Sequence, residues 1–179
     1  VSIWCLERSE YRPTSRRDLG PLSVLRGGFG RCEEQNILFI AAARAVGLPV
    51  RQATVPWWPQ ADGNHAWVEA WTEGGWRYLE TSAPFRHLGA TWFTSQTPRM
   101  PKVAAYAYGH PVAPQIYRTG PGFALADSTP AYTKATRVQI HIQDAAQPQD
   151  IYLSVPCMGG LRSVTKVLSD AQGQTNTVL

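Results

Sequence analysis

The sequence predicts an α+β protein in which a helix with a cysteine at its N-terminal end packs on an antiparallel sheet. Three observations lead to this fold class. A glycine-rich turn runs into Cys32 and is followed by apolar residues at helical spacing. The runs Ala66–Trp71 and Trp76–Leu79 are rich in aromatic and β-branched residues and flank a glycine-containing turn, as in a β-hairpin. From Thr136 onward apolar and polar residues alternate, which indicates further strands.

The helix is predicted to span Glu33 to Val46. Gly47 and Pro49 close the segment, because glycine favours a helix C-terminus and proline cannot continue one. The apolar positions that define the pattern are Ile37, Ile40, Ala41 and Ala45.

Cys32 therefore lies at or just before the first helical turn. There the unpaired backbone N–H groups and the helix dipole favour a thiolate, the reactive form of cysteine. Glu33 and Glu34 suit a helix start, but their charges oppose a nearby thiolate. The Cys32 N–H is a candidate oxyanion donor, and Arg31 beside it is assigned to the same oxyanion or cleft region.

His65 and Glu80 lie on the two strands of the predicted hairpin. A two-residue loop between Thr72 and Gly75 places them on one face as diagonal neighbours, within reach of a hydrogen bond. A three-residue loop would put them on opposite faces, and a four-residue loop would bring them together again.

Each of the three residues also has a structural interpretation. Cys32 taken alone fits a small buried residue, His65 an ordinary strand histidine, and Glu80 a solvated carboxylate at a strand end. The joint pattern is more specific, because a thiol, an imidazole and a carboxylate together supply a nucleophile, a base and an orienting group for acyl transfer.

Four stretches resemble the transglutaminase-like superfamily, in its bacterial branch, which is related to the papain-like cysteine peptidases. They are Gly30-Arg31-Cys32-Glu33-Glu34, Arg44-Ala45-Val46-Gly47-Leu48-Pro49-Val50-Arg51-Gln52, Asn64-His65-Ala66-Trp67-Val68-Glu69 and Trp76-Arg77-Tyr78-Leu79-Glu80-Thr81. The resemblance implies a papain/transglutaminase-like core with Cys32 as nucleophile, His65 as base and Glu80 as third member of a triad, although many members have Asp there.

The tryptophans divide into two groups. Trp58 follows the predicted strand Val50–Val55 and, by the same resemblance, is the candidate for walling the cleft or donating to an oxyanion. The others are expected in the core or on the hairpin face: Trp67, Trp71, Trp76 and Trp92.

Composition narrows the function classes. The net charge of +4 over 179 residues comes mainly from arginines that do not follow a nucleic-acid-binding pattern, so a solvated or salt-bridged face is expected and nucleic acid is not, while an acidic substrate is left open. The resemblance implies a peptide or protein substrate. No apolar run is long enough to cross a membrane. The chain starts without Met, so it is expected to be a processed product or a fragment. The resemblance implies an extracytoplasmic location, and the incomplete set of C-terminal strands predicts a multidomain parent protein.

The remaining cysteines and histidines are expected to be structural. Cys5 and Cys157 have no metal-ligand spacing with any histidine; buried thiols are expected, and a disulfide between them is left open. No metal or cofactor is predicted. The other histidines have no sequence partners: His87, His110 and His141.

Three regions are predicted along the chain. Residues 1–110 form the catalytic core, residues 111–135 a proline-rich wrap or linker, and residues 136–179 a partial β-sandwich that resembles carboxypeptidase regulatory-like repeats. A turn at Asp170–Gly173 leads to a last strand.

Two functions are compatible with these features. The preferred one is thiol-dependent acyl transfer on peptide or amide substrates, with hydrolysis favoured over transglutamination by the resemblance. The alternative is a non-catalytic domain that binds peptide or glycan within a multidomain extracytoplasmic protein.

Overall fold

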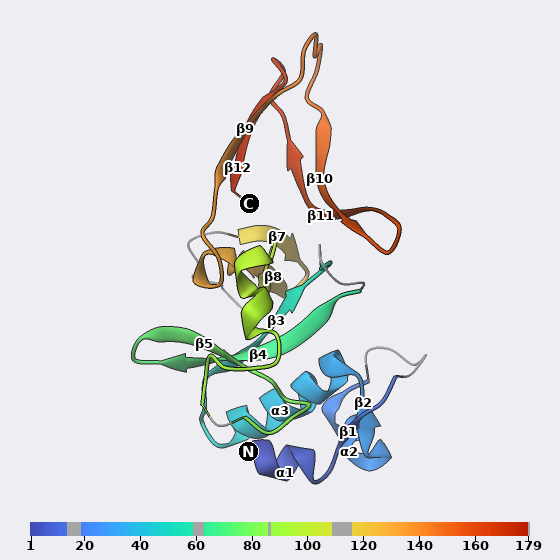
Figure 1. Ribbon diagram of the computed structural model, residues 1–179, viewed down its shortest axis with the longest axis vertical. Coiled ribbons are helices and arrows are strands. Elements are labelled where there is room, and N and C mark those ends of the chain that lie inside the picture. Colours follow the sequence, from blue (N-terminus) through green and yellow to red (C-terminus); the bar gives the residue numbers. More distant parts are fainter. Residues whose placement is uncertain (14–18, 59–62, 86, 109–115, 179) are drawn as a thin grey trace. The chain divides into compact units, whose positions relative to one another are not determined.

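The computed structural model describes residues 1–13, 19–58, 63–85, 87–108 and 116–178 (Figure 1). The chain divides into two compact units. The first unit comprises Val1–Thr54, His65–Ser95 and Ala105–Ala126, and the second comprises Val55–Asn64, Gln96–Ala104 and Asp127–Leu179.

Among the described residues, the first unit has three α-helices: α1 (Ser2–Leu6), α2 (Pro21–Gly27) and α3 (Cys32–Ala45). The predicted helix is confirmed as α3, shifted by one residue at each end. Its buried stripe differs from the predicted one, because Leu38, Phe39 and Ala43 are buried while Ala41 and Ala45 are exposed. Several faces of this helix carry apolar residues, so the spacing alone did not select the face that meets the sheet.

A six-stranded sheet has the order β5-β4-β3-β6-β8-β7. Its strands are β3 (Val50–Val55), β4 (His65–Thr72), β5 (Gly75–Leu79), β6 (Ala104–Tyr108), β7 (Ile116–Gly120) and β8 (Phe123–Asp127). Together with the helices this confirms the α+β fold class.

The hairpin of β4 and β5 is confirmed, and its register is the one that a two-residue loop gives among the three loop lengths considered. The strands are antiparallel, Thr72 pairs with Gly75, and Val68 pairs with Leu79. The loop therefore has two residues, and the alternation of side chains carries His65 and Glu80 to the same face.

The core of the first unit lies between α3 and this hairpin. Its members come from α1, α2, α3, β3, β4 and β5 and are Cys5, Val24, Leu38, Phe39, Ala43, Val50, Val68 and Leu79. Helix α3 packs on β4 and α2 packs on α3. Helix α3 is thus held against β4 by apolar burial.

The glycine-rich turn before α3 has two distinct functions in the fold. Gly28 ends α2 in the left-handed conformation, with φ of 72°. Gly30 lies in β2 (Phe29–Gly30), which pairs with β1 (Glu10–Tyr11), and a Cβ at Gly30 would lie 2.7 Å from the Glu34 Cβ. Gly30 is therefore required for the close packing of the first turn of α3.

The stretch predicted as a linker contributes to the sheet. Strands β7 and β8 are antiparallel, and Gly120 pairs with Phe123 across a tight turn in which Gly122 has φ of 73°. The prolines that suggested a linker lie outside both strands, so they do not interrupt the pairing.

The second unit carries the predicted C-terminal strands: β9 (Arg137–His141), β10 (Asp150–Cys157), β11 (Gly160–Leu168) and β12 (Gln174–Val178). They form two antiparallel pairs, β9 with β12 and β10 with β11. The predicted turn is confirmed, because Gly173 N–H donates to Asp170 O at 3.1 Å. Membership of a β-sandwich stays a prediction.

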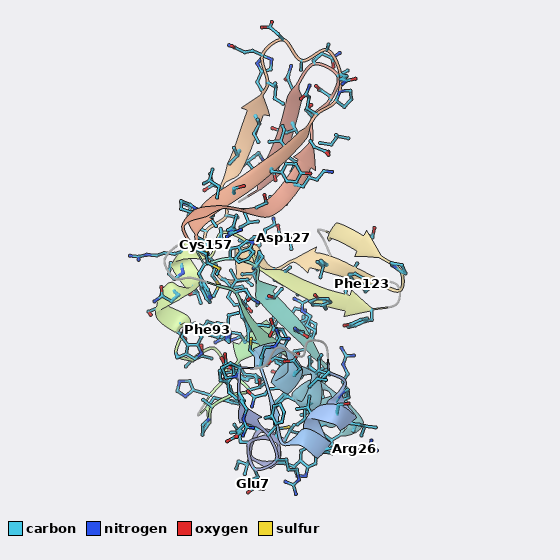
Figure 2. The ribbon with its side chains drawn as sticks, turned by 90° about the vertical axis from the view of Figure 1, so that its right-hand side faces the viewer. Glu7, Arg26, Phe93, Phe123, Asp127 and Cys157 are labelled. Carbon is cyan, nitrogen blue, oxygen red and sulfur yellow. The ribbon has the colours of Figure 1, made fainter. Side chains whose placement is uncertain are left out.

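Two further features complete the second unit. The buried pair Lys102 Nζ and Asp127 Oδ2 lies 2.5 Å apart, and Asp127 Oδ1 accepts a hydrogen bond from Thr129 Oγ1 (Asp127 is labelled in Figure 2). The 3₁₀-helices η1 (Thr94–Arg99) and η2 (Thr129–Ala131) flank these groups in the chain. Among the described residues, no helix is long and apolar enough to span a membrane.

Replacing Gly30 by alanine is expected to destabilise the first unit by about 1–3 kcal/mol, because the added Cβ overlaps the Glu34 Cβ. Chemical unfolding of both proteins measures this difference. Gly74→Ala is the matched control, since a Cβ at Gly74 meets no atom within 4 Å. Equal destabilisation of the two variants would contradict the packing argument.

Candidate active site

Cys32 is the first residue of α3, and its sulfur forms hydrogen bonds with Glu33 and Ala66. The thiol donates a hydrogen bond to Glu33 Oε2 at 3.1 Å. The backbone N–H of Ala66 donates to the same sulfur. Because Ala66 follows His65 directly, the sulfur lies beside the start of β4.

The thiol is the resting form of Cys32. Burial raises its pKa, and the charge and hydrogen bond of Glu33 raise it further, to about 12; the N–H groups of Ala66 and Glu33 act in the opposite direction but are weaker. Burial, followed by the Glu33 carboxylate, therefore outweighs the N–H groups near the helix start that favour a thiolate.

Glu34 does not act on the sulfur as Glu33 does, because Arg31 neutralises it. The Arg31 Nε and Nη2 atoms donate to Glu34 Oε2 and Oε1 at 3.0 and 2.5 Å, and the Arg31 backbone N–H donates to Oε2 at 2.9 Å. The bond to Glu34 raises the pKa of Arg31. Arg31 thus fixes the start of α3, while its predicted contribution to an oxyanion site or cleft stays a prediction.

His65 is buried and has a defined hydrogen-bond partner. Its Nε2 lies 2.9 Å from Glu80 Oε2, and its backbone carbonyl accepts a hydrogen bond from Thr54 Oγ1. An ionised carboxylate only accepts hydrogen bonds, so Nε2 carries the hydrogen and Nδ1 of a neutral ring is left as the basic nitrogen. The structure therefore brings His65 and Glu80 together, as the hairpin register predicted.

Glu80 is held as an anion by an almost complete set of donors. Oε1 accepts from the Thr81 and Ser82 backbone N–H groups at 2.8 and 3.1 Å and from Ser82 Oγ at 2.9 Å. Burial acts to raise its pKa, but the hydrogen bond and charge of His65 and the bonds from Ser82 outweigh burial and hold the pKa at about 2.

Trp92 is a member of this cluster that the sequence analysis did not identify. Its indole Nε1 donates to Glu80 Oε2 at 2.9 Å, and its ring centroid lies 5.0 Å from that of His65. The side chain is 61 % exposed, so the prediction that Trp92 is a core or hairpin-face residue is wrong. No periodic pattern surrounds Trp92, and only the folded loop brings it to the carboxylate.

The imidazole rests against buried aromatic rings. Trp67 and Phe93 are fully buried, and their centroids lie 6.0 and 5.4 Å from that of His65 (Phe93 is labelled in Figure 2). The assignment of Trp67 to the core is therefore confirmed. Trp71 and Trp76 face each other across the hairpin, with centroids 5.3 Å apart, as predicted for hairpin-face residues.

A buried hydrogen bond links α3 to the segment that carries Glu80. Thr81 Oγ1 donates to Asn36 Oδ1 at 2.6 Å, and both residues are buried. Asn36 lies one turn after Cys32 on α3, so this bond ties the helix of the thiol to the carboxylate of the His65–Glu80 pair.

Trp58 belongs to the second unit. Its side chain is buried, and its backbone N–H donates to Gly63 O at 3.1 Å. Its predicted contribution to a cleft or an oxyanion site stays a prediction.

The other cysteines and histidines lie elsewhere. Cys5 and Cys157 are buried thiols, as expected, and the Cys157 sulfur lies 3.9 Å from Gly63 O. His87 and His141 are exposed, and His110 lies outside the described residues.

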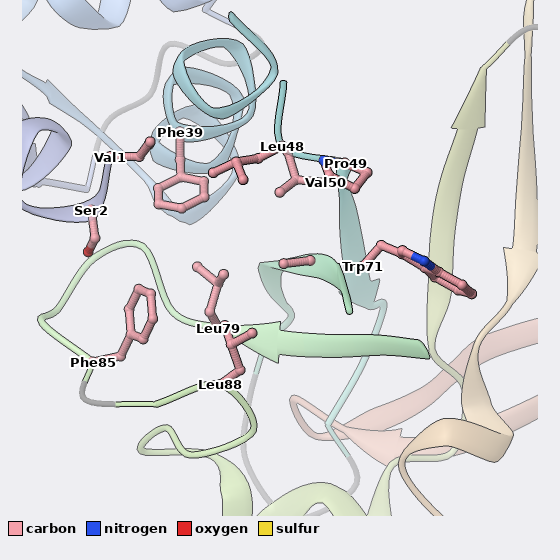
Figure 3. A pocket seen from close by; sticks show the side chains of 11 residues that line it. Val1, Ser2, Phe39, Leu48, Pro49, Val50, Trp71, Leu79, Phe85 and Leu88 are labelled. Atoms are coloured by element: carbon pink, nitrogen blue, oxygen red, sulfur yellow. The ribbon is translucent and has the colours of Figure 1, made fainter. Parts of the chain in front are cut away.

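An apolar cavity of about 400 Å³ lies in the first unit, away from the three candidate residues (Figure 3). Phe39 of α3, Leu79 of β5 and Phe85 and Leu88 of the following loop point into it. None of the side chains that line it is Cys32, His65 or Glu80, so the site described above is separate from this cavity.

A family model matches the part of the chain that carries the candidate residues. Residues 1–81 match the family model of the transglutaminase-like superfamily, and this range contains Cys32, His65 and Glu80. The predicted resemblance is thereby confirmed for this part of the chain. At the level of the superfamily, the match supports a thiol-dependent, peptidase-like function.

One solved structure is similar to the chain, a protein from Cytophaga hutchinsonii described as a "putative cysteine protease". The two share 24% sequence identity, the TM-score is 0.39, and the match covers 45% of this chain and 29% of that one. This chain therefore matches less than a third of the length of that protein. No curated protein matches the chain significantly.

Replacing Glu33 by glutamine is expected to increase the alkylation rate of Cys32 at pH 7–8 by about tenfold or more, because a negative charge that raises the thiol pKa is removed. Iodoacetamide labelling followed by peptide mass spectrometry measures the rate at Cys32 alone. The matched control is Glu73→Gln, which removes an exposed carboxylate from the hairpin loop. An unchanged rate in Glu33→Gln would show that burial, and not Glu33, keeps the thiol protonated.

The Glu80 carboxylate is expected to make stability depend on acid pH. Its folded pKa of about 2 lies below the usual 4.5, so its ionised form stabilises the fold above about pH 4.5 and that contribution disappears as the pH falls through 2. Between about pH 5 and 2 the wild type should lose about 3 kcal/mol that Glu80→Gln does not lose. Unfolding by urea across this range measures both proteins, with Glu7→Gln, an exposed carboxylate, as control. Parallel pH curves for wild type and Glu80→Gln would contradict this account.

Proposed function

We propose that this protein is a thiol-dependent acyl-transfer enzyme that acts on peptide or amide bonds, with hydrolysis as its preferred outcome. Cys32 is the nucleophile, His65 the general base and Glu80 the carboxylate that orients the imidazole. The observation that carries the proposal is the 2.9 Å hydrogen bond between His65 Nε2 and Glu80 Oε2, which leaves Nδ1 as the basic nitrogen.

The position of Cys32 supports the same assignment. Its sulfur accepts a hydrogen bond from the N–H of Ala66, the residue next to His65, so the thiol and the imidazole belong to one small region of the first unit. As the first residue of α3, Cys32 also has a backbone N–H without an intrahelical acceptor, which suits an oxyanion donor.

The reaction follows from these assignments. His65 Nδ1 accepts the thiol proton while Cys32 Sγ forms a bond to the substrate carbonyl carbon, and the carbonyl oxygen becomes an oxyanion. The imidazolium then gives its proton to the leaving amine as the C–N bond breaks, which leaves a thioester. Water, deprotonated by His65, attacks the thioester and releases the acid and the free thiol. An amine in place of water gives acyl transfer.

Glu33 sets a condition on this reaction. The thiol donates its hydrogen bond to Glu33 Oε2, with the sulfur 3.1 Å from that oxygen, so the first step requires the thiol to turn from Glu33 toward His65. Because a thiol with a pKa of about 12 is almost fully protonated near neutral pH, proton transfer must accompany the attack.

The protonated state of Cys32 also favours a second candidate function, a non-catalytic domain that binds peptide or glycan. In that case the hydrogen bond between Cys32 and Glu33 is a permanent structural contact. The two functions differ in the effect of His65 on the thiol: if His65 is the general base, His65→Ala slows alkylation of Cys32, whereas it leaves the alkylation rate of a structural thiol unchanged.

An acyl-donor screen tests the enzyme proposal. Wild type, Cys32→Ala and His65→Ala are incubated with peptide and amide libraries, with and without an added primary amine, and products are read by mass spectrometry. We expect hydrolysis by wild type, a thioester adduct on Cys32, and loss of at least about a thousandfold in both variants. Product formation that is equal in wild type and Cys32→Ala would overturn the assignment of the nucleophile.

A further inference from the structure

Trp92 contacts both members of the His65–Glu80 pair. Its indole N–H donates to Glu80 Oε2, the same oxygen that lies 2.9 Å from His65 Nε2. Its ring lies against the imidazole, with centroids 5.0 Å apart and planes inclined by 58°. One side chain thus reaches the carboxylate through a charge-assisted hydrogen bond and the histidine through its aromatic surface.

The segment that presents Trp92 is anchored to the sheet. The neighbouring Phe93 is fully buried and meets the indole edge to face, with centroids 5.5 Å apart. Thr94 Oγ1 accepts hydrogen bonds from the Thr91 backbone N–H and the Tyr78 hydroxyl at 2.8 and 3.2 Å. Because Tyr78 lies in β5, its hydrogen bond to Thr94 ties the segment of Trp92 to the strand that leads to Glu80.

Burial of the indole does not account for this position. The side chain is 61 % exposed, and a large apolar group left in water contributes little hydrophobic free energy. The position is explained instead by the hydrogen bond from the indole N–H to Glu80 Oε2. Oε1 of Glu80 accepts hydrogen bonds from Thr81 and Ser82. In the part of the first unit that the structure describes, the hydrogen-bond partners of Oε2 are His65 and Trp92.

We propose that Trp92 is a positioning residue of the site: its indole N–H and ring hold the hydrogen bond between Glu80 and His65 in one geometry and keep water from it. This inference concerns the site of the proposed function, and the importance of Trp92 for catalysis rests on that function. Without Trp92, water can reach Glu80 Oε2 and compete with the imidazole, which frees the ring to turn.

The test separates the two contacts that Trp92 makes. Trp92→Phe keeps an aromatic ring but removes the N–H donor, and Trp92→Ala removes both. Trp71→Phe and Trp71→Ala are the matched controls, because Trp71 is another half-exposed tryptophan of the first unit without a contact to Glu80 among its described partners. The proton on His65 Nε2 is observed by NMR and assigned from its absence in His65→Gln.

In wild type we expect a downfield imidazole N–H signal that exchanges slowly with water. Trp92→Phe should speed that exchange about tenfold, as expected for the loss of one hydrogen bond to a charged group, and Trp92→Ala should speed it further. The Trp71 variants should leave the signal unchanged. Amide spectra with wild-type dispersion confirm folding. If Trp92→Ala does not fold, the exchange rate of the His65 signal in Trp92→Phe alone tests the proposal. An unchanged shift and exchange rate in every folded Trp92 variant overturns the proposal.

The same variants distinguish failure of this inference from failure of the proposed function. The NMR signal of His65 needs no substrate, so it reports on Trp92 even if Cys32 proves unreactive. Where an acyl donor is cleaved, Trp92→Phe should lower kcat about tenfold and leave KM unchanged, since Trp92 acts through Glu80. Cleavage at the wild-type kcat by Trp92→Phe would overturn the positioning role and leave the acyl-transfer proposal intact.

Discussion

The hydrogen bond between His65 Nε2 and Glu80 Oε2 is the interaction on which the arrangement of the candidate site depends. It exists because a two-residue loop sets the register of β4 and β5, and that register puts both side chains on one face of the sheet. Backbone and hydroxyl donors of the residues after Glu80 keep the carboxylate ionised despite its burial. The imidazole consequently has a defined tautomer, and the choice of its free nitrogen follows from the fold.

The two glutamates that follow Cys32 differ in the group that each carboxylate contacts. Glu34 is fully buried, but Arg31 compensates its charge with two side-chain hydrogen bonds and a backbone bond, so it stabilises the start of α3. Glu33 accepts the thiol proton and opposes ionisation of Cys32. Successive side chains on a helix point about 100° apart, so the Glu34 carboxylate reaches Arg31 while the Glu33 carboxylate reaches the Cys32 sulfur.

Local patterns predicted those features that depend on neighbours in sequence. The strand from Val50 to Val55, the hairpin loop and the helix after Cys32 all follow from turn residues and spacing, and the structure contains each of them. The buried face of α3 was predicted incorrectly, because its apolar residues occupy more than one face. The strands between 116 and 127 were not expected, since the prolines around them resemble those of a linker.

By itself the sequence determined the helix after Cys32 and a hairpin that carries His65 and Glu80, because each depends on a few residues within one supersecondary unit. The structure selected the two-residue loop among the lengths that the sequence allowed, and with it the meeting of His65 and Glu80. The tertiary structure alone decided three other features: the contact of Cys32 with Glu33 and Ala66, the bond from Thr81 to Asn36, and the placement of Trp92 on Glu80. These depend on rotamers and on loops that return to the sheet, and no periodicity encodes where such a loop places a side chain.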